Sequence, residues 1–163
     1  MDSILKIYST SITSPIGVLV LKGSKESLLS VSFCDVPKKK SKDIPQILVE
    51  TMTQLTEYFE GKRTAFNLPL KPQGTPFQKK VWTQLQQIPY GKTSSYQEMA
   101  NTLGDPKVIR AAAAANGKNP IAIIIPCHRV IGSDGSLTGY AGGLHRKKWL
   151  LQHESPLKQG ELF

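Results

Sequence analysis

The chain has 163 residues, enough for one well-formed hydrophobic core or two small ones. Its 39% hydrophobic and 20% charged residues are typical of a globular protein, and no apolar run approaches the roughly 20 residues that a membrane-spanning helix needs. The formal net charge of +9 arises from 21 basic and 12 acidic residues and favours a polyanionic partner.

The N-terminal sequence "MDSILKIYST" lacks the basic region and the long apolar core of a signal peptide. We therefore expect a cytoplasmic protein of bacterial type, or a nuclear one if the source is eukaryotic. Two cysteines do not suggest a disulfide framework. The three histidines and two cysteines show no spacing typical of zinc ligands, so we expect no metal site.

The first half of the chain predicts a small α/β unit. The segment "KIYSTSITSPIGVLVLKGSKESLLSVSF" is typical of strands joined by tight turns. Cys34 follows this segment, and we expect it to be a structural residue near a strand end. After a charged loop at 37–43, we expect a helix that ends at Gly61 and buries one apolar face. That face comprises Ile47, Leu48, Met52, Leu55, Tyr58 and Phe59.

A connector rich in proline and glycine, "FNLPLKPQGTPF", leads into a mainly helical second half. The first helix there is expected to end before Pro89 and to turn inward Phe77, Val81, Trp82 and Leu85. In the next helix, Ser95 and Glu98 have the spacing of a capping box, and Gly104 breaks the pattern. Asp105 then predicts the cap of a further helix, with Pro106 at its first position.

Two short helices joined by "LGDP" predict a helix-turn-helix, whose second helix carries five consecutive alanines, Ala111 to Ala115. The alanines could reflect helix propensity or close packing alone. They also leave a helix face that can approach a DNA minor groove, with Arg110 positioned as a wedge. Charge supports this reading, because residues 75–163 carry 11 basic and 5 acidic residues (net +6), against 10 and 7 (net +3) in residues 1–74.

The segment from Ile121 to Ile125 predicts a short strand buried on both faces, ended by Pro126. A thiol, an imidazole and a guanidinium follow at once, in Cys127, His128 and Arg129. The remaining elements are expected to be a hairpin in "GSDGSLTGYAGG" and a final helix in "LHRKKWLLQHE".

Cys127 is the candidate nucleophile, although a buried structural thiol is the simpler alternative. A free thiol near its ordinary pKa of about 8.5 is only a few per cent ionised at pH 7, so it needs a base or a positive charge nearby. His128 can act as that base if the chain turns after Pro126 or if a water bridges the two side chains. Glu154 could then hold the second ring nitrogen of His128. No phosphate loop or dinucleotide fingerprint is present, so we expect no cofactor.

The segment "IPCHRVIGSDGSLTGYAGGLHRKKWLLQHE", with "GTPFQKKVWTQLQQIPYGKTSSYQEMA" upstream of it, resembles the signature of the O6-alkylguanine-DNA alkyltransferases. The resemblance covers Gly74 to Glu154 nearly without gaps. It implies a ribonuclease H-like α/β domain at 1–70 and, at 71–163, a mainly α domain with a winged-helix-like helix-turn-helix. It also implies single-turnover repair, in which the cysteine irreversibly takes the alkyl group from O6-alkylguanine and, more weakly, from O4-alkylthymine.

The resemblance also implies the roles of individual residues. Cys127 is the acceptor, His128 and Glu154 form a relay that acts through water, Asn119 orders the segment before the cysteine, and Tyr140 donates to the guanine. The implied DNA-binding residues are Thr93, Ser94, Tyr96, Arg110, Ala111, Ala112 and Arg129. The implied substrate pocket contains Met99, Ala141, Gly142 and Trp149.

The expected partner is the minor groove of double-stranded DNA that contains O6-alkylguanine, bound by a monomer. Two other hypotheses stay open. A lesion-binding module with an inert cysteine would bind the same DNA without transfer, and a cysteine hydrolase or acyltransferase would use Cys127 and His128 over many turnovers.

Overall fold

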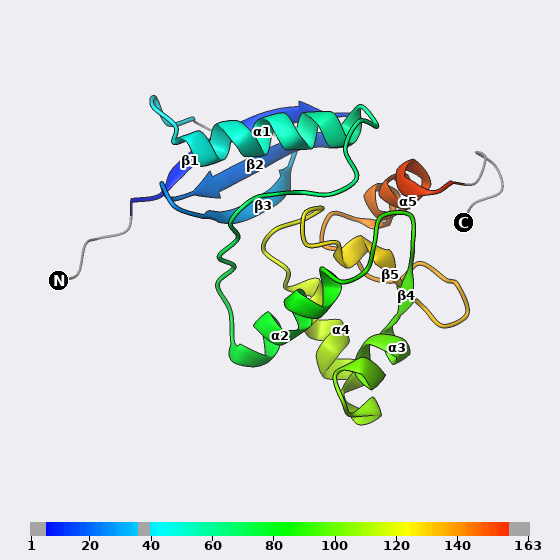
Figure 1. The fold of residues 1–163 in the computed structure, drawn as a ribbon. Coiled ribbons are helices and arrows are strands. Elements are labelled where there is room, and N and C mark those ends of the chain that lie inside the picture. The colour runs from blue at the N-terminus through cyan, green and yellow to red at the C-terminus, as the bar shows by residue number, and fades with distance from the viewer. Residues whose placement is uncertain (1–5, 36–39, 157–163) are drawn as a thin grey trace. The chain divides into compact units, whose positions relative to one another are not determined.

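The computed structural model describes residues 6–35 and 40–156, and the chain divides into two compact units, Met1–Gln73 and Gly74–Phe163 (Figure 1). Residues 37–39 of the expected charged loop lie outside the described residues. Within the described part of the chain, no helix has the length and apolar character needed to cross a membrane.

The first unit is built on three antiparallel strands in sequential order: β1 (Tyr8–Ser14), β2 (Gly17–Gly23) and β3 (Leu28–Cys34). Leu19 and Leu21 of β2 are fully buried. Helix α1 (Gln46–Phe59) covers one face of this sheet, as Figure 1 shows. The predicted strands are confirmed, and Cys34 is the last residue of β3 and only partly buried.

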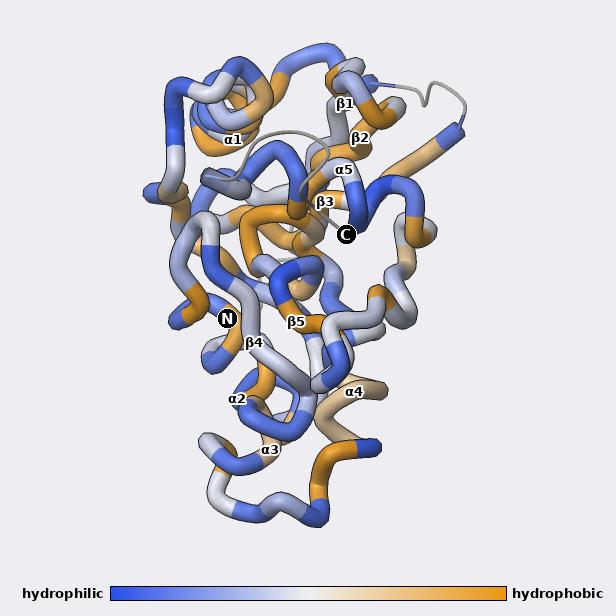
Figure 2. Tube along the Cα trace, turned by 90° about the vertical axis from the view of Figure 1, so that its right-hand side faces the viewer, coloured by the Kyte–Doolittle hydropathy of each residue, from blue (hydrophilic) through white to orange (hydrophobic). Residues whose placement is uncertain are grey.

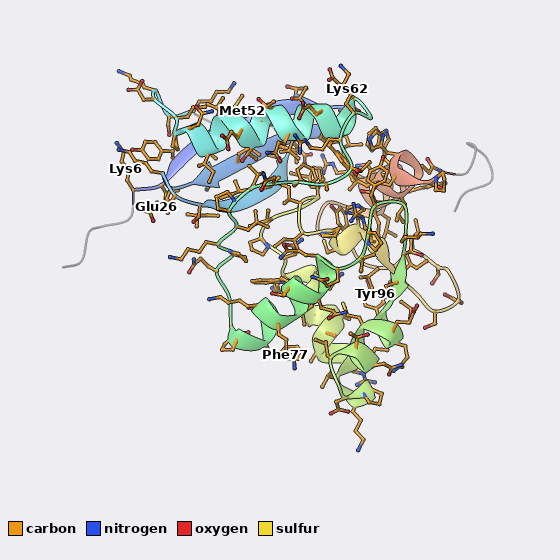
Figure 3. The ribbon with its side chains drawn as sticks, viewed as in Figure 1. Lys6, Glu26, Met52, Lys62, Phe77 and Tyr96 are labelled. Carbon is orange, nitrogen blue, oxygen red and sulfur yellow. The ribbon has the colours of Figure 1, made fainter. Side chains whose placement is uncertain are left out.

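The buried face of α1 differs from the predicted one at four positions. Met52 (labelled in Figure 3) and Phe59 are only partly buried, whereas Thr51 and Gln54 are buried. Gln54 satisfies its amide by accepting from Asn67 N at 2.9 Å and donating to Asn67 O at 3.1 Å. Thr51 Oγ1 donates to Ile47 O of its own helix at 2.7 Å. Both polar residues thus occupy core positions because they are hydrogen-bonded there, which hydropathy periodicity does not reveal.

The second unit begins with α2 (Pro76–Leu85) and α3 (Tyr96–Thr102), both started by capping boxes. In α3, Ser95 Oγ accepts from Glu98 N at 3.0 Å, and Glu98 Oε1 accepts from Ser95 N at 3.1 Å. This confirms the predicted cap. Gly104 ends the turn after α3 with a φ of +99°, a conformation that favours glycine.

The helix predicted from Asp105 onward is divided into two. Asp105 caps a 3₁₀ turn, η1 (Pro106–Val108), by accepting from Lys107 N, and α4 (Ile109–Gly117) follows. Helix α4 packs against both α2 and α3, and Trp82 Nε1 of α2 donates to Ala115 O at 2.9 Å. The alanine run appears pale orange in Figure 2.

The predicted strand at Ile121–Ile125 is wrong. These residues form a tight turn in which Ile125 N donates to Ile121 O at 3.1 Å and Ile123 adopts a φ of +72°. A buried aliphatic run predicts an interior position, but a turn held by side chains can bury it as well as a sheet does.

The predicted hairpin at 132–143 is also wrong. Gly132 N closes a turn onto Ser136 O at 2.9 Å, but no second strand follows in the described residues. The short strand β5 (Val130–Ile131) pairs in parallel with β4 (Ser94–Ser95). The predicted final helix is confirmed as α5 (Leu144–Glu154).

Candidate active site

Asn119 holds the turn that precedes the cysteine. Its Nδ2 donates to Ile125 O at 2.8 Å and its Oδ1 accepts from Ile121 N at 3.0 Å. A β-branched residue such as Ile123 rarely adopts a positive φ, and such a conformation costs about 1–3 kcal/mol. The two Asn119 bonds therefore maintain a backbone shape that the isoleucine by itself disfavours.

Cys127 lies at the first position of the 3₁₀ turn η2 (Cys127–Arg129), directly after this clamped segment. Cys127 N donates to Ile125 O at 2.8 Å, and 6% of the residue's surface stays exposed. Burial raises the pKa of the Cys127 thiol, while the Asn119 amide and the Lys147 ammonium oppose that rise. The resting sulfur is thus a thiol, and it needs a base to become a nucleophile.

His128 and Glu154 form a buried pair, with 2.7 Å between His128 Nε2 and Glu154 Oε2. Arg129 donates to both oxygens of the same carboxylate, from Nε to Oε1 at 2.7 Å and from Nη2 to Oε2 at 3.0 Å. Its third hydrogen bond runs from Nη1 to Ile88 O at 2.7 Å. One carboxylate at the end of α5 therefore holds both side chains that follow the cysteine.

This arrangement determines the protonation of the ring. Burial lowers the pKa of His128 and Glu154 opposes that change, which leaves the imidazole neutral near pH 7. Burial alone would raise the pKa of Glu154, but His128 and Arg129 bring it well below its ordinary value. The anionic carboxylate accepts from Nε2–H, so the lone pair is on His128 Nδ1, which is buried and has no hydrogen-bond partner among the described residues. The ring is thus a neutral base whose tautomer is fixed by its neighbour.

The burial of Arg129 disfavours the prediction that it contacts DNA. Only 6% of the residue is exposed, and its guanidinium donates three hydrogen bonds, to Glu154 and to Ile88 O. A buried guanidinium with bidentate pairing is a structural partner of the carboxylate. Sequence position next to the cysteine gave no information on this burial.

A hollow of about 520 Å³ brings together three of the predicted residues, namely Tyr96, Arg110 and Tyr140. Tyr96 is the first residue of α3 (Figure 3), and its hydroxyl donates to Thr138 O at 3.5 Å. Burial raises the pKa of Tyr140 well above its ordinary value, so its hydroxyl keeps its proton near pH 7. Arg110 is exposed at the start of α4.

The other residues predicted to bind DNA are divided between surface and core. Thr93 and Ala111 are exposed and Ser94 is half-buried, so all three can be reached from outside. Ala112 is fully buried, which disfavours the prediction that it contacts DNA. The helix turns Ala112 and Ala115, three positions apart, inward, where their small size permits close helix packing.

The hollow does not include the four residues predicted to form the substrate pocket. Met99 is only 1% exposed and belongs to the core, and the Trp149 ring stacks on His153 with 4.8 Å between centroids. Gly142 is buried and Ala141 is exposed.

Two residues at the site were missed by sequence reasoning. Lys147 is fully buried, donates from Nζ to Thr138 O at 2.6 Å and has its pKa lowered by burial to about 8. Its position on the inward face of α5, in register with Leu150, Leu151 and Glu154, was the available signal. Asn116, also buried, lines the hollow.

Comparison with known families matches both halves of the chain. A family described as "6-O-methylguanine DNA methyltransferase, DNA binding domain" matches residues 76–156. A second, "6-O-methylguanine DNA methyltransferase, ribonuclease-like domain", matches residues 7–72.

Among relatives, a methylated-DNA–protein-cysteine methyltransferase of Methanosarcina barkeri is 48% identical over 155 residues, which cover 91% of this chain and 97% of that protein. One from Mycobacterium tuberculosis is 43% identical over 160 residues, with 96% and 97% covered.

Solved structures give the same result. The crystal structure of Mycobacterium tuberculosis O6-methylguanine methyltransferase has a TM-score of 0.84 at 42% identity and covers 95% of this chain and 96% of that one. The structure of the Mycobacterium tuberculosis protein in complex with DNA has a TM-score of 0.81 at 45% identity, with 90% and 92% covered. The chain therefore belongs to the 6-O-methylguanine DNA methyltransferase family.

Proposed function

We propose that this protein repairs O6-alkylguanine in duplex DNA by moving the alkyl group irreversibly to Cys127. The observation that carries the proposal is the buried His128–Glu154 pair directly after the cysteine, with 2.7 Å between Nε2 and Oε2. It supplies a neutral base whose lone pair is on Nδ1, beside a thiol that burial keeps protonated.

In the proposed reaction, His128 Nδ1 takes the Cys127 proton through one bridging water as Sγ attacks the alkyl carbon. The S–C bond forms while the C–O6 bond breaks, and the electron pair of that bond stays on guanine O6. Tyr140, protonated at pH 7, donates to the departing base and offsets its charge. The product is a thioether, so each molecule reacts once and no cofactor is needed.

DNA binding is assigned to the α3–α4 helix-turn-helix. Helix α4 presents small side chains, and the exposed Arg110 at its start is suited to fill the space left by an extruded nucleotide. We further propose that residues 71–163 form the DNA-binding and active-site domain and residues 1–70 a separate one. A cytoplasmic or nuclear location and a monomeric state stay predictions.

The test is a mass measurement after incubation with duplex DNA that contains O6-methylguanine. We expect the peptide containing Cys127 to gain one methyl group, and a Cys127→Ser variant to gain none, because a serine hydroxyl stays protonated at neutral pH. Transfer to Cys34 instead, or no gain from authenticated substrate, would contradict the proposal. Tight lesion binding without any mass gain would identify a damage-binding module.

A further inference from the structure

Asn116 is a buried amide whose oxygen bonds to nothing in the described part of the chain. It lies in the last turn of α4, is 3% exposed, and its Oδ1 is buried without a hydrogen-bond partner. Leaving a buried acceptor unsatisfied costs about 1–3 kcal/mol, and such groups are uncommon in folded proteins. An apolar side chain of similar size would avoid this cost, so the amide calls for a partner outside the protein.

Asn119, one turn further along the chain, provides the contrast. Both polar atoms of its amide are bonded within the protein, to Ile125 O and Ile121 N. Asn119 therefore has a structural role that its own contacts explain. The contacts of Asn116 explain no such role.

The position of Asn116 indicates what the partner is. It lines the same hollow as Arg110, the proposed wedge, and Tyr140, the proposed donor to the base. Under the proposed function, on which this step rests, the ligand that enters this hollow is the flipped base. An unpartnered acceptor requires a donor on that base.

The chemistry of the lesion leaves one candidate donor. Alkylation at O6 removes the proton from N1 of guanine, so the exocyclic amino group at N2 is the only N–H donor on the base. We propose that Asn116 Oδ1 accepts a hydrogen bond from this N2 amino group. Asn116 then selects the guanine lesion over O4-alkylthymine, whose base has no N–H donor after alkylation.

The expected size of this selection follows from the unsatisfied acceptor. A site built around a hydrogen bond rejects an analogue that lacks the donor, because the buried partner is left unpaired. We expect the protein to react about tenfold or more slowly with a base that lacks only the amino group.

The experiment compares single-turnover methyl transfer from three duplexes that contain O6-methylguanine, O6-methylhypoxanthine (the same base without the N2 amino group) or O4-methylthymine. We expect the wild-type protein to prefer the first over the second about tenfold or more. Asn116→Ala should slow the first reaction by a similar factor, leave the second unchanged and reduce the preference over O4-methylthymine. Gln87→Ala, which truncates an exposed amide outside the helix-turn-helix, is the matched control and should leave all ratios unchanged.

Two results would overturn the proposal. One is a wild-type protein that reacts equally with the two purines, which decides the matter even if the Asn116 variants do not fold. The other is an Asn116→Ala or Asn116→Leu variant that slows both purines equally, which would indicate a structural role. If no transfer occurs at all, the proposed function fails, and the same ratios measured as binding affinities in a Cys127→Ser background still test Asn116.

Discussion

Two arginines of the same unit, Arg110 and Arg129, have opposite environments. Arg110 is exposed at the start of α4, whereas Arg129 is 6% exposed and donates three hydrogen bonds, two of them to Glu154. Both were candidates for DNA contact on the basis of charge and position. The comparison teaches that a cationic side chain can bind DNA only if it is not already buried and paired with a carboxylate inside the protein.

The same contrast separates the helix that approaches DNA from the turn that carries the cysteine. The α4 surface is composed of small side chains and one long cation, so it can contact a groove without rearranging the core. Around Cys127, in contrast, Asn119, Arg129 and Glu154 are held by several short hydrogen bonds. We infer that substitutions on α4 alter binding, while substitutions around Glu154 alter stability and chemistry together.

The largest effect is expected from removing the buried Arg129, which pairs with Glu154. Arg129→Met leaves the Glu154 carboxylate buried without its bidentate partner, which should lower the free energy of unfolding by about 3–5 kcal/mol. Urea denaturation followed by circular dichroism measures the change. Arg110→Met is the matched control, and it should stay within about 0.5 kcal/mol of the wild type because Arg110 is exposed. Equal destabilisation by both variants would refute the distinction.

Acid tests the same cluster without removing the arginine. The pKa of Glu154 in the folded protein lies well below its ordinary value of 4.5, so its contribution to stability is complete above pH 4.5 and is lost as the pH falls. We expect the free energy of unfolding to fall by about 2 kcal/mol between pH 4.5 and pH 3, because Glu154 becomes protonated in the unfolded chain while it stays ionised in the folded one.

Glu154→Gln should be less stable at pH 7 and should lack this part of the acid dependence. Denaturant titrations of both proteins at several pH values give the difference. Parallel stability curves for the two proteins would show that Glu154 is not the group responsible.

The smallest effect on the fold, and the most specific effect on function, is expected at Arg110. Arg110→Ala should slow repair in duplex DNA by about tenfold to a hundredfold, because extruding a base costs a few kcal/mol that the wedge partly offsets. Reaction with free O6-benzylguanine should be unchanged, since no base must be extruded. Stopped-time mass measurements on both substrates sharpen the comparison, and equal slowing on both would count against the wedge role.

Local signals along the chain predicted much of the fold. The Ser95–Glu98 capping box and the glycines that end α1 and α3 act between residues a few positions apart, so their outcome depends little on the rest of the molecule. The reactive cysteine and its histidine were identified from their residue types and from the family resemblance, before any contact was known.

Tertiary contacts decided the features that depend on residues far apart in the sequence. The run Ile121–Ile125 is as apolar as a buried strand, but the amide of Asn119 bonds it into a turn with Ile123 at positive φ. Whether Asn116 is bonded depends on which atoms surround α4, and its residue type carries no information about that. Composition and spacing determine helix ends and candidate chemistry, because these depend on near neighbours. Burial and pairing of Arg129 depend on Glu154, which is distant along the chain and meets it only once α5 has packed.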